Sequence, residues 1–518
     1  MERRKFLKYT SSTLAAPFLF QGQWMNVMAQ GPTTDWLASY NPDRKLVLIQ
    51  LNGGNDGLNM VIPISQYDNL VKARGNILVP QSQILKLTDE TGFHPAMPEL
   101  TNLYKDGLVK IIQGVGYPNP NLSHFRSKDI LMSASDSNIV VNSGWLGRLF
   151  SEKHPDFPEG YPNSAMPHPI ALTIGSASSA ICQGELANYS SVLNSLSASY
   201  SNSAGNVSYP ETPFGKELRY LSGMMEQTEG YLSVVKAAAS KAKNLSTRYP
   251  AAGQNALADQ LKIVANLIAG GLQTQIYVVN LGGWDTHSLQ VGSLSDKSTG
   301  AHPLLMSKLS VAIAAFEDDL KLMKKSDEVI GFVYTEFGRR IKSNDSLGTD
   351  HGTTWPAIVF GSKINPGIIG KNAVIPSVVG KSDNLELQTD FRSIYASIYK
   401  QWFNINDQTI EGLLGKLFPE VALIANNSDV IADLPVKSLR IWPNPVEDNA
   451  SISFTADGSL AQIVIYSMSG QQIESYSPQN YAEGYMQIRL ELGHLHAGVY
   501  LLVIRRRKQS ESVKFVVR

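Results

Sequence analysis

The sequence predicts an α/β fold with a mainly parallel sheet flanked by helices, followed by a small C-terminal all-β sandwich. Apolar runs that end in glycine and polar residues are typical of buried strands, and stretches with helical periodicity lie between them. Strands that alternate with helices favour a parallel sheet covered on both faces. After about Asp433, short alternating runs separated by Gly, Asn and Asp replace this pattern and are typical of a sandwich.

The α/β part extends over residues 40–425. Its expected buried strands are KLVLIQL (45–51), LVKIIQGVG (108–116), QIYVVNLGG (275–283) and EVIGFVYTEFG (328–338). Its expected helices cover residues 95–107, 215–245, 255–271 and 302–325. The all-β part covers residues 435–518, where strands are short and turn residues are frequent.

Composition excludes several classes of protein. Hydrophobic residues make up 43% of the 518 residues, which is enough for a large core. The formal net charge is zero, so no basic field indicates a nucleic-acid partner. Cys182 is the single cysteine, which excludes an intramolecular disulfide and a cysteine-rich metal site.

The N-terminus indicates export. Arg3 and Arg4, followed by Phe6, Leu7 and Lys8, resemble a twin-arginine signal with a short apolar stretch behind it, and cleavage near Ala29 gives a signal peptide over residues 1–29. The alternative is a basic N-terminal arm. No other stretch reaches about 18 consecutive apolar residues, so we expect no stable transmembrane span in the mature protein.

Four polar clusters follow expected strands, within residues 46–59, 114–129, 280–288 and 333–361. Ligands of open α/β sheets bind outside the carboxyl ends of the strands, so we expect the clusters to share one crevice. Together they offer Asp56, Ser123, His124, Asp285, His287, Glu336, Asp350 and His351.

These residue types suit a metal ion. Mixed imidazole and carboxylate ligands bind zinc, manganese or iron. Asp285 and His287 are two residues apart, so both point the same way from an extended chain. Each motif alone has a plainer interpretation: turns at WDTH and TDHG, an ion pair of Glu336 with Arg339 or Arg340, and a capping or surface role for His302.

The motifs LNGGNDGLN, SHFRSKD, GWLGRLF, GGWDTH, TEFGRR and TDHG, over residues 40–420, resemble the domain of unknown function 1501 family. Their order is also similar to that of the alkaline phosphatase and sulfatase superfamily. The resemblance implies an alkaline phosphatase-like core, a divalent metal (zinc first, with manganese or calcium as alternatives) and hydrolysis of small-molecule or glycan phosphate or sulfate esters.

The resemblance also implies roles for individual residues. The expected metal ligands are Asp285, His287, His351, Glu336 and Asp56. The expected catalytic group is Ser123 as nucleophile, with His124 beside it and Arg126 binding the anionic substrate.

Three features depart from the superfamily pattern: Asn52 stands at a metal position, Phe337 replaces a ligand, and the PNPN turn has no hydroxyl. They favour the alternative, a non-catalytic descendant that binds a ligand or glycan at the cell surface.

The C-terminal motifs WPNP, YSMSGQQI, GVYLLVI and KFVVR resemble the C-terminal sorting domain of the type IX (Por) secretion system. This resemblance implies the type IX machinery as partner and passage through the periplasm to the outer-membrane surface or the extracellular space. The alternative is a carbohydrate-binding or adhesion sandwich.

Overall fold

The computed structural model describes most of the chain. The described residues are 16–20, 23–27, 43–164, 166–184, 187–194, 210, 212, 214–215, 230–425, 439–442, 444–446, 448–456, 458–467, 470–481, 484–506 and 510–517. The chain divides into two compact units, Met1–Asn426 and Asn427–Arg518, and each is considered by itself.

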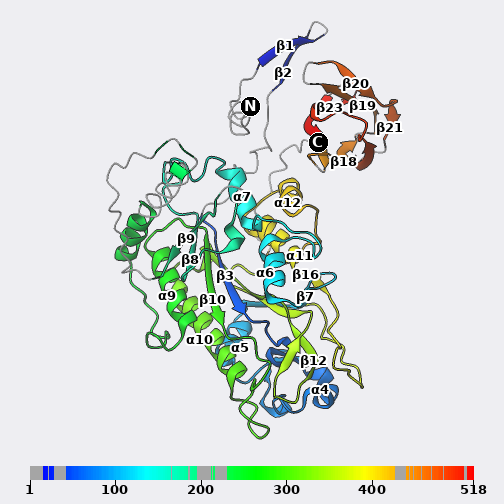
Figure 1. Cartoon of the computed structure of the whole chain (residues 1–518). Coiled ribbons are helices and arrows are strands. Elements are labelled where there is room, and N and C mark those ends of the chain that lie inside the picture. Colours follow the sequence, from blue (N-terminus) through cyan, green and yellow to red (C-terminus); the bar gives the residue numbers. More distant parts are fainter. Residues whose placement is uncertain are drawn as a thin grey trace. The chain divides into compact units, whose positions relative to one another are not determined.

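The first unit is built on one large sheet (Figure 1). Within the described residues this sheet has nine strands: β3 (Lys45–Asn52), β7 (Val109–Gly116), β8 (Ala171–Ile174), β9 (Ser190–Leu193), β10 (Ile276–Gly282), β11 (Val329–Thr335), β14 (Trp355–Phe360), β15 (Gly367–Ile369) and β16 (Thr389–Asp390). The order is β15-β7-β14-β11-β3-β10-β8-β9, with β16 beside β7. Only β14 runs antiparallel to its neighbours, so the predicted mainly parallel sheet is confirmed.

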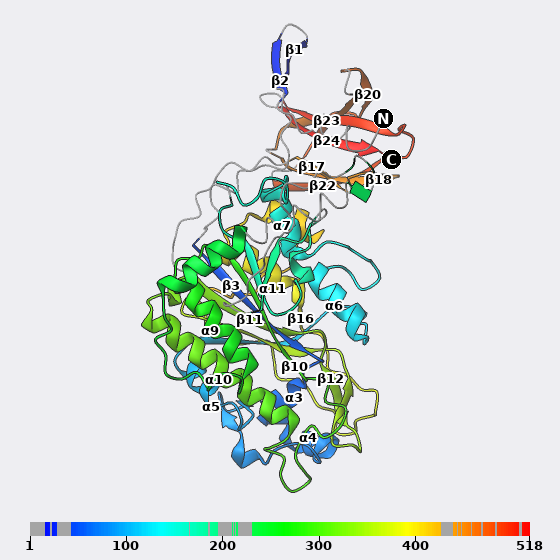
Figure 2. The same cartoon turned by 60° about the vertical axis from the view of Figure 1, so that its left-hand side comes forward.

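Helices cover both faces of the sheet (Figure 2). They are α5 (Pro98–Lys105), α6 (His124–Ser133), α7 (Trp145–Lys153), α9 (Ala256–Ala269), α10 (Ala301–Leu322), α11 (Phe391–Ser397) and α12 (Asp407–Leu414). Alternate residues of β3 enter two different cores: Leu46 and Leu48 pack with α6, α7, α11 and α12, while Val47 and Ile49 pack with α5, α9 and α10. This double burial explains why β3 reads as a continuous apolar run.

Smaller elements complete the first unit. Its remaining strands are β1 (Ala16–Phe20), β2 (Gln23–Val27), β4 (Val61–Pro63), β5 (Leu85–Lys86), β6 (Thr91–Phe93), β12 (Arg339–Ser343) and β13 (Thr349–His351). Its short helices are α3 (Gly57–Met60), η1 (Ile64–Gln66), α4 (Tyr67–Arg74), η2 (Gln81–Gln83), η3 (Ala180–Cys182), η4 (Ser326–Glu328) and η5 (Ile398–Trp402).

Two predictions fall partly outside the described residues. Arg3 and Arg4 of the expected export signal lie there, although β1 and β2 pair within the predicted signal segment 1–29. Of the helix expected over residues 215–245, the described stretch 230–241 is helical.

The second unit consists of two antiparallel sheets. One contains β17 (Arg440–Trp442), β18 (Asn449–Ala456) and β22 (Gly484–Glu491); the other contains β19 (Leu460–Ser467), β20 (Gln472–Ser475), β21 (Gln479–Asn480), β23 (Gly498–Arg506) and β24 (Ser510–Val517). Ile452 and Phe454 from the first sheet share a core with Ile463, Ile465 and Leu502 from the second. The expected C-terminal β-fold is therefore present. Among the described residues of the whole chain, no helix is long and apolar enough to cross a membrane.

Candidate metal centre

The polar clusters predicted from the sequence meet at one edge of the large sheet. β10 and β11 run parallel to β3 and end level with it, because Gly282 pairs with Asn52 and Thr335 with Leu51. β7 runs in the same direction, and β14 begins beside its end, where Trp355 pairs with Val115. The loops after β3, β7, β10 and β11 and the segment before β14 therefore share this edge, as predicted.

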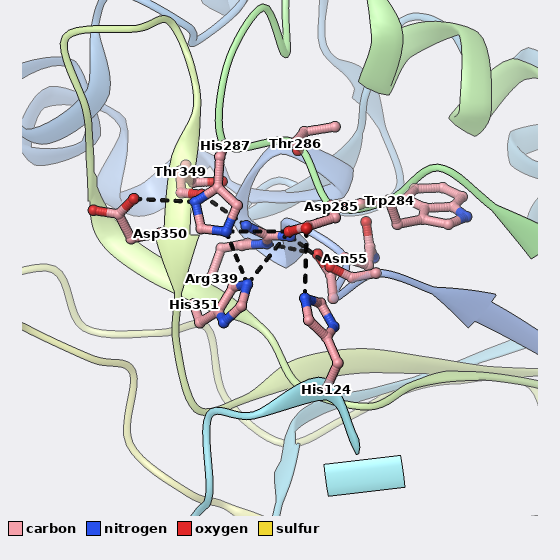
Figure 3. Close-up of polar contacts among 12 residues, drawn as sticks. Asn55, His124, Trp284, Asp285, Thr286, His287, Arg339, Thr349, Asp350 and His351 are labelled. Atoms are coloured by element: carbon pink, nitrogen blue, oxygen red, sulfur yellow. Dashed lines mark hydrogen bonds and ion pairs between the residues drawn. The ribbon is translucent and has the colours of Figure 1, made fainter. Parts of the chain in front are cut away.

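Four side chains from three of these segments converge (Figure 3). His124 begins α6, Asp285 and His287 follow β10, and His351 ends β13. Ligand atoms of His124, Asp285 and His351 all lie within 4.8 Å of one another. Nε2 of His287 lies 3.2 Å from Asp285 Oδ1 and 2.9 Å from Nε2 of His351. The four side chains thus surround one small volume.

Each of the three imidazole rings has an oxygen partner at its Nδ1 atom, on the side of the ring opposite the converging atoms. The partners are Glu336 Oε1 for His124 at 2.9 Å, Asp350 Oδ1 for His287 at 3.3 Å and the backbone oxygen of Leu122 for His351 at 2.8 Å. A backbone oxygen or an ionised carboxylate oxygen can accept a hydrogen bond but cannot donate one. The three oxygens therefore favour a proton on Nδ1 and a lone pair on Nε2 of each ring. Histidine ligands of metal ions have this outer arrangement.

The contact between the Nε2 atoms of His287 and His351 indicates whether a cation fits between these two rings. With both Nδ1 atoms protonated, the Nε2 atoms of His287 and His351 present lone pairs to each other at 2.9 Å. Such a contact is repulsive unless a positive charge, a proton or a metal ion, is shared between the two nitrogens. Asp285 adds a carboxylate beside them. The donor set of three nitrogens and one oxygen fits a divalent cation such as zinc.

Arg339 keeps Asp285 charged and in place. Its guanidinium is buried and donates to Asp285 Oδ1 at 2.7 Å and to backbone oxygens of Gly53, Gly54, Trp284 and Thr349. Burial alone raises the pKa of Asp285, but the hydrogen bond and charge of Arg339 outweigh this effect and hold the pKa below its ordinary value. The carboxylate is therefore available as a ligand.

Two segments of the chain match known protein families. Residues 43–420, most of the chain, match a family described as protein of unknown function (DUF1501). The chain belongs to this family. Residues 440–518 match the secretion system C-terminal sorting domain, which indicates export to the outer-membrane surface or the extracellular space. A comparison with curated proteins found no match.

Several solved structures are similar to the chain at low identity. A protein in the alkaline phosphatase superfamily from Vibrio parahaemolyticus is 9% identical, with 95% of this chain and 92% of that chain covered and a TM-score of 0.32. A putative sulfatase from Bacteroides fragilis is 11% identical, with 90% and 91% covered and a TM-score of 0.31. PorZ, a surface component of the type IX secretion system of Porphyromonas gingivalis, is 17% identical, with 15% of this chain and 11% of PorZ covered and a TM-score of 0.13. This chain spans only about a tenth of the length of PorZ and of PorU from the same organism.

Asp56 of the DUF1501 domain lies outside the group of four converging side chains. Its side chain is 1% exposed, and its two oxygens lie 2.7 and 2.8 Å from Nη1 of Arg74. Gln290 donates a further hydrogen bond at 2.6 Å. The carboxylate is thus engaged in a buried ion pair, and its predicted role as a metal ligand in place of Asn52 stays a prediction.

Glu336 is close to the centre, but it contacts His124 at Nδ1, on the side of the ring away from the converging atoms. It is fully buried and accepts hydrogen bonds from His124 Nδ1 and, at 2.9 Å, from the backbone N–H of Gly53. Glu336 therefore orients His124, and its predicted role as a direct metal ligand stays a prediction. His124, expected beside the nucleophile, takes the place among the ligand side chains instead.

Arg126 points away from the centre. Its Nη2 atom donates to the backbone oxygens of Ser137 and Ile139, at 3.2 and 2.6 Å. Arg126 therefore supports the loop after α6, and its predicted substrate-binding role stays a prediction. Ser123 is exposed at the N-cap of α6, beside His124, and its predicted role as nucleophile stays a prediction.

Phe337 closes one side of the centre. Its ring is fully buried, with its centroid 4.8 Å from that of His124 and 4.4 Å from that of His351. Gly54, with a φ of +81°, allows this packing, because a Cβ there would lie 2.3 Å from the Phe337 ring. The glycines of the loop after β3 therefore serve close packing around the ligands rather than ligand binding.

Some contacts were not visible in the sequence. His302, expected as a capping or surface residue, is fully buried with its Nε2 atom 2.9 Å from Asn55 Oδ1. Lys128 lies four residues after His124 on α6, with its Nζ atom 3.8 Å from Glu336 Oε1. The i, i+4 spacing from His124 was the available signal for Lys128.

Proposed function

We propose that the DUF1501 domain binds one divalent metal ion, zinc in the first place, through His124, Asp285, His287 and His351. The observation that carries this proposal is the convergence of three Nε2 atoms and one carboxylate, with every Nδ1 atom held by an oxygen. Nitrogen-rich sites favour zinc over calcium, which prefers oxygen ligands.

We further propose that this centre hydrolyses phosphate or sulfate esters outside the cell. Asp285, Glu336 and Asp350 carry three negative charges around the histidines, whereas Arg339 and Lys128 carry two positive charges. A bound divalent cation changes the local formal charge from minus one to plus one, which favours an anionic substrate.

The groups of the chain then have distinct tasks. A divalent cation held by His124, Asp285, His287 and His351 would supply Lewis-acid polarisation of the ester oxygen. The exposed hydroxyl of Ser123, at the N-terminus of α6, is the candidate nucleophile, and the helix dipole there favours negative charge. Arg339 and Glu336 hold Asp285 and His124 in position.

A second candidate function is non-catalytic binding of an anionic ligand or glycan at the cell surface. Two observations favour it: the Phe337 ring occupies the space beside His124 and His351, and Asp56 is bound to Arg74. A two-metal clamp on both the attacking and the leaving oxygen has no second set of ligands among the described residues.

The test is metal analysis of the full chain, combined with assays on aryl phosphate and aryl sulfate esters. We expect about one bound ion per chain, and His351→Ala should abolish its binding. His494→Ala serves as the matched control, because His494 is an exposed histidine of the second unit that contacts Glu474. Metal without hydrolysis would favour the second candidate, and absence of metal would refute both the centre and the hydrolase.

We propose that export has two steps. The type IX secretion machinery recognises residues 440–518. Before that step, a twin-arginine signal over residues 1–29 directs passage across the inner membrane. The match of residues 440–518 to the sorting domain supports recognition by the type IX secretion machinery. Replacement of Arg3 and Arg4 by lysine should leave the protein in the cytoplasm, which fractionation and blotting would detect.

A further inference from the structure

The charged side chains near the centre differ in how many of their donors are already used. Arg339 directs all three of its nitrogens to partners within the protein. Arg126 is bound to backbone oxygens of the 137–139 segment, and Arg340 donates to the backbone oxygen of Ser382. These three arginines are therefore engaged in holding loops together.

Lys128 is different. Its nearest charged partner, Glu336 Oε1, is 3.8 Å away, which is too long for a hydrogen bond. That oxygen already accepts from the backbone N–H of Gly53 and lies 2.9 Å from His124 Nδ1. The side chain of Lys128 is 31% exposed, so its three N–H donors can reach a ligand from solvent.

The position of Lys128 directs it to the metal centre. His124 and Lys128 are four residues apart in α6, so they lie one above the other on the same face of the helix. Both approach the same oxygen of Glu336. The ammonium group thus lies near the Glu336 oxygen that contacts His124, on a side chain that is partly exposed to solvent.

We propose that Lys128 binds the anionic oxygens of the phosphate or sulfate group at the centre. The proposal rests on the proposed function for the identity of the ligand, but it makes a separate claim about the binding residue. Glu336 Oε1 lies between the two side chains of this arrangement, 2.9 Å from His124 Nδ1 and 3.8 Å from Lys128 Nζ. A point charge on a flexible chain suits an oxyanion with no fixed orientation.

The experiment measures binding of inorganic phosphate and inorganic sulfate to the full chain by isothermal titration calorimetry, with metal content determined on the same samples. The variants are Lys128→Gln and Lys128→Arg. Lys105→Gln is the matched control, because Lys105 is an exposed lysine at the end of α5 on another part of the domain. No step of this assay requires hydrolysis.

We expect Lys128→Gln to weaken phosphate binding by about tenfold to a hundredfold, because a charge-assisted hydrogen bond is lost. Metal content should not change, since Lys128 is not a ligand. Lys128→Arg should restore most of the affinity, and Lys105→Gln should have none of these effects. A role of Lys128 limited to neutralising Glu336 would alter metal content or thermal stability instead of the phosphate Kd.

Two results would overturn the proposal: unchanged phosphate affinity in Lys128→Gln, or no measurable phosphate and sulfate binding to the wild-type protein. Phosphate binding that depends on Lys128 without any ester hydrolysis would support the proposal while refuting the hydrolase. The failure of the binding residue and the failure of the catalytic function are therefore separable.

Discussion

Glu336 shows how one buried carboxylate can determine the geometry of a centre without touching its ligand volume. It accepts a hydrogen bond from the loop after β3, through Gly53, and it holds the ring of His124 on α6. The charge is tolerated in a fully buried position because N–H groups surround it. The orientation and basicity of His124 therefore depend on Glu336.

Glu336→Gln should weaken metal binding by about tenfold to a hundredfold without abolishing it, as expected for a residue that acts behind a ligand. The measurement is a competitive titration with a zinc chelator. Glu159→Gln, an exposed substitution far from these contacts, is the control. Complete loss of metal at saturating zinc would show instead that Glu336 is itself a ligand.

Asp56→Asn tests the other predicted ligand that lies outside the four converging side chains. The substitution leaves Arg74 buried without its charged partner and should lower the free energy of unfolding by about 3 kcal/mol or more. Metal content should be unchanged, because Asp56 is not part of the centre. Urea denaturation followed by fluorescence measures the first quantity, and a fall in bound metal in the folded variant would contradict the assignment.

The candidate site was partly predictable at this scale. Asp285 and His287 could be paired from their spacing, and His351 from its place in the last polar cluster together with the family resemblance. The pairing of His124 with Glu336 and of Asp56 with Arg74 could not, because it depends on the distance between loops in space. A buried carboxylate that follows a strand looks the same in the sequence whether it binds a metal ion or an arginine.

At the scale of elements, apolar runs predicted four of the nine strands that the described residues place in the large sheet, namely β3, β7, β10 and β11, but not the direction of every strand. β14 has the same buried, apolar character as β3 and β11, yet it runs antiparallel between β11 and β7. Its direction follows from the connection: the hairpin of β12 and β13 returns the chain to the edge where β11 ended. A short connection of this kind permits an antiparallel neighbour, whereas a parallel one requires a crossover.

Helix α10 carries a buried acid that links stability to pH. Glu317 is 4% exposed, its Oε1 atom has no hydrogen-bond partner, and burial raises the pKa of this carboxyl from 4.5 to about 8. The folded protein therefore keeps a proton that the unfolded chain loses. The contribution of Glu317 to stability is fully present below about pH 4.5 and declines as the pH rises toward 8.

Glu317→Gln should remove this dependence, because the amide is neutral at every pH. We expect the variant to gain stability over the wild type between pH 5 and pH 8, by an amount on the order of 2 kcal/mol. Thermal unfolding at the two pH values measures the difference. Glu90→Gln, at an exposed position, should show no such gain; an equal difference between variant and wild type at both pH values would refute the assignment.

At the scale of the whole molecule, the chain combines a DUF1501 domain and a sorting domain with separate cores. The candidate ligands all lie within the unit Met1–Asn426, whereas the sorting domain has its own core between two sheets. Metal binding and delivery are therefore expected to depend on different parts of the chain.

Removal of metal should accordingly affect one unit. With free zinc about a hundredfold above its Kd, binding stabilises the first unit by roughly 3 kcal/mol, so a chelator should lower the Tm of that unit and leave the second transition in place. Differential scanning calorimetry of the full chain, with zinc and with chelator, measures both transitions. The His351→Ala variant should not respond to the chelator, and an equal response would show a different source of the shift.

The spread of the ligands along the chain has a consequence for the order of events during synthesis. The side chains of the candidate centre begin at residue 124 and end at residue 351, and the segments that carry them, after β7, after β10 and at the end of β13, meet only in the folded domain. A ribosome must therefore release more than two thirds of the polypeptide before the last imidazole emerges. Until then the ion can find at most a partial set of ligands, so capture of the ion marks a chain that has completed its long-range pairing.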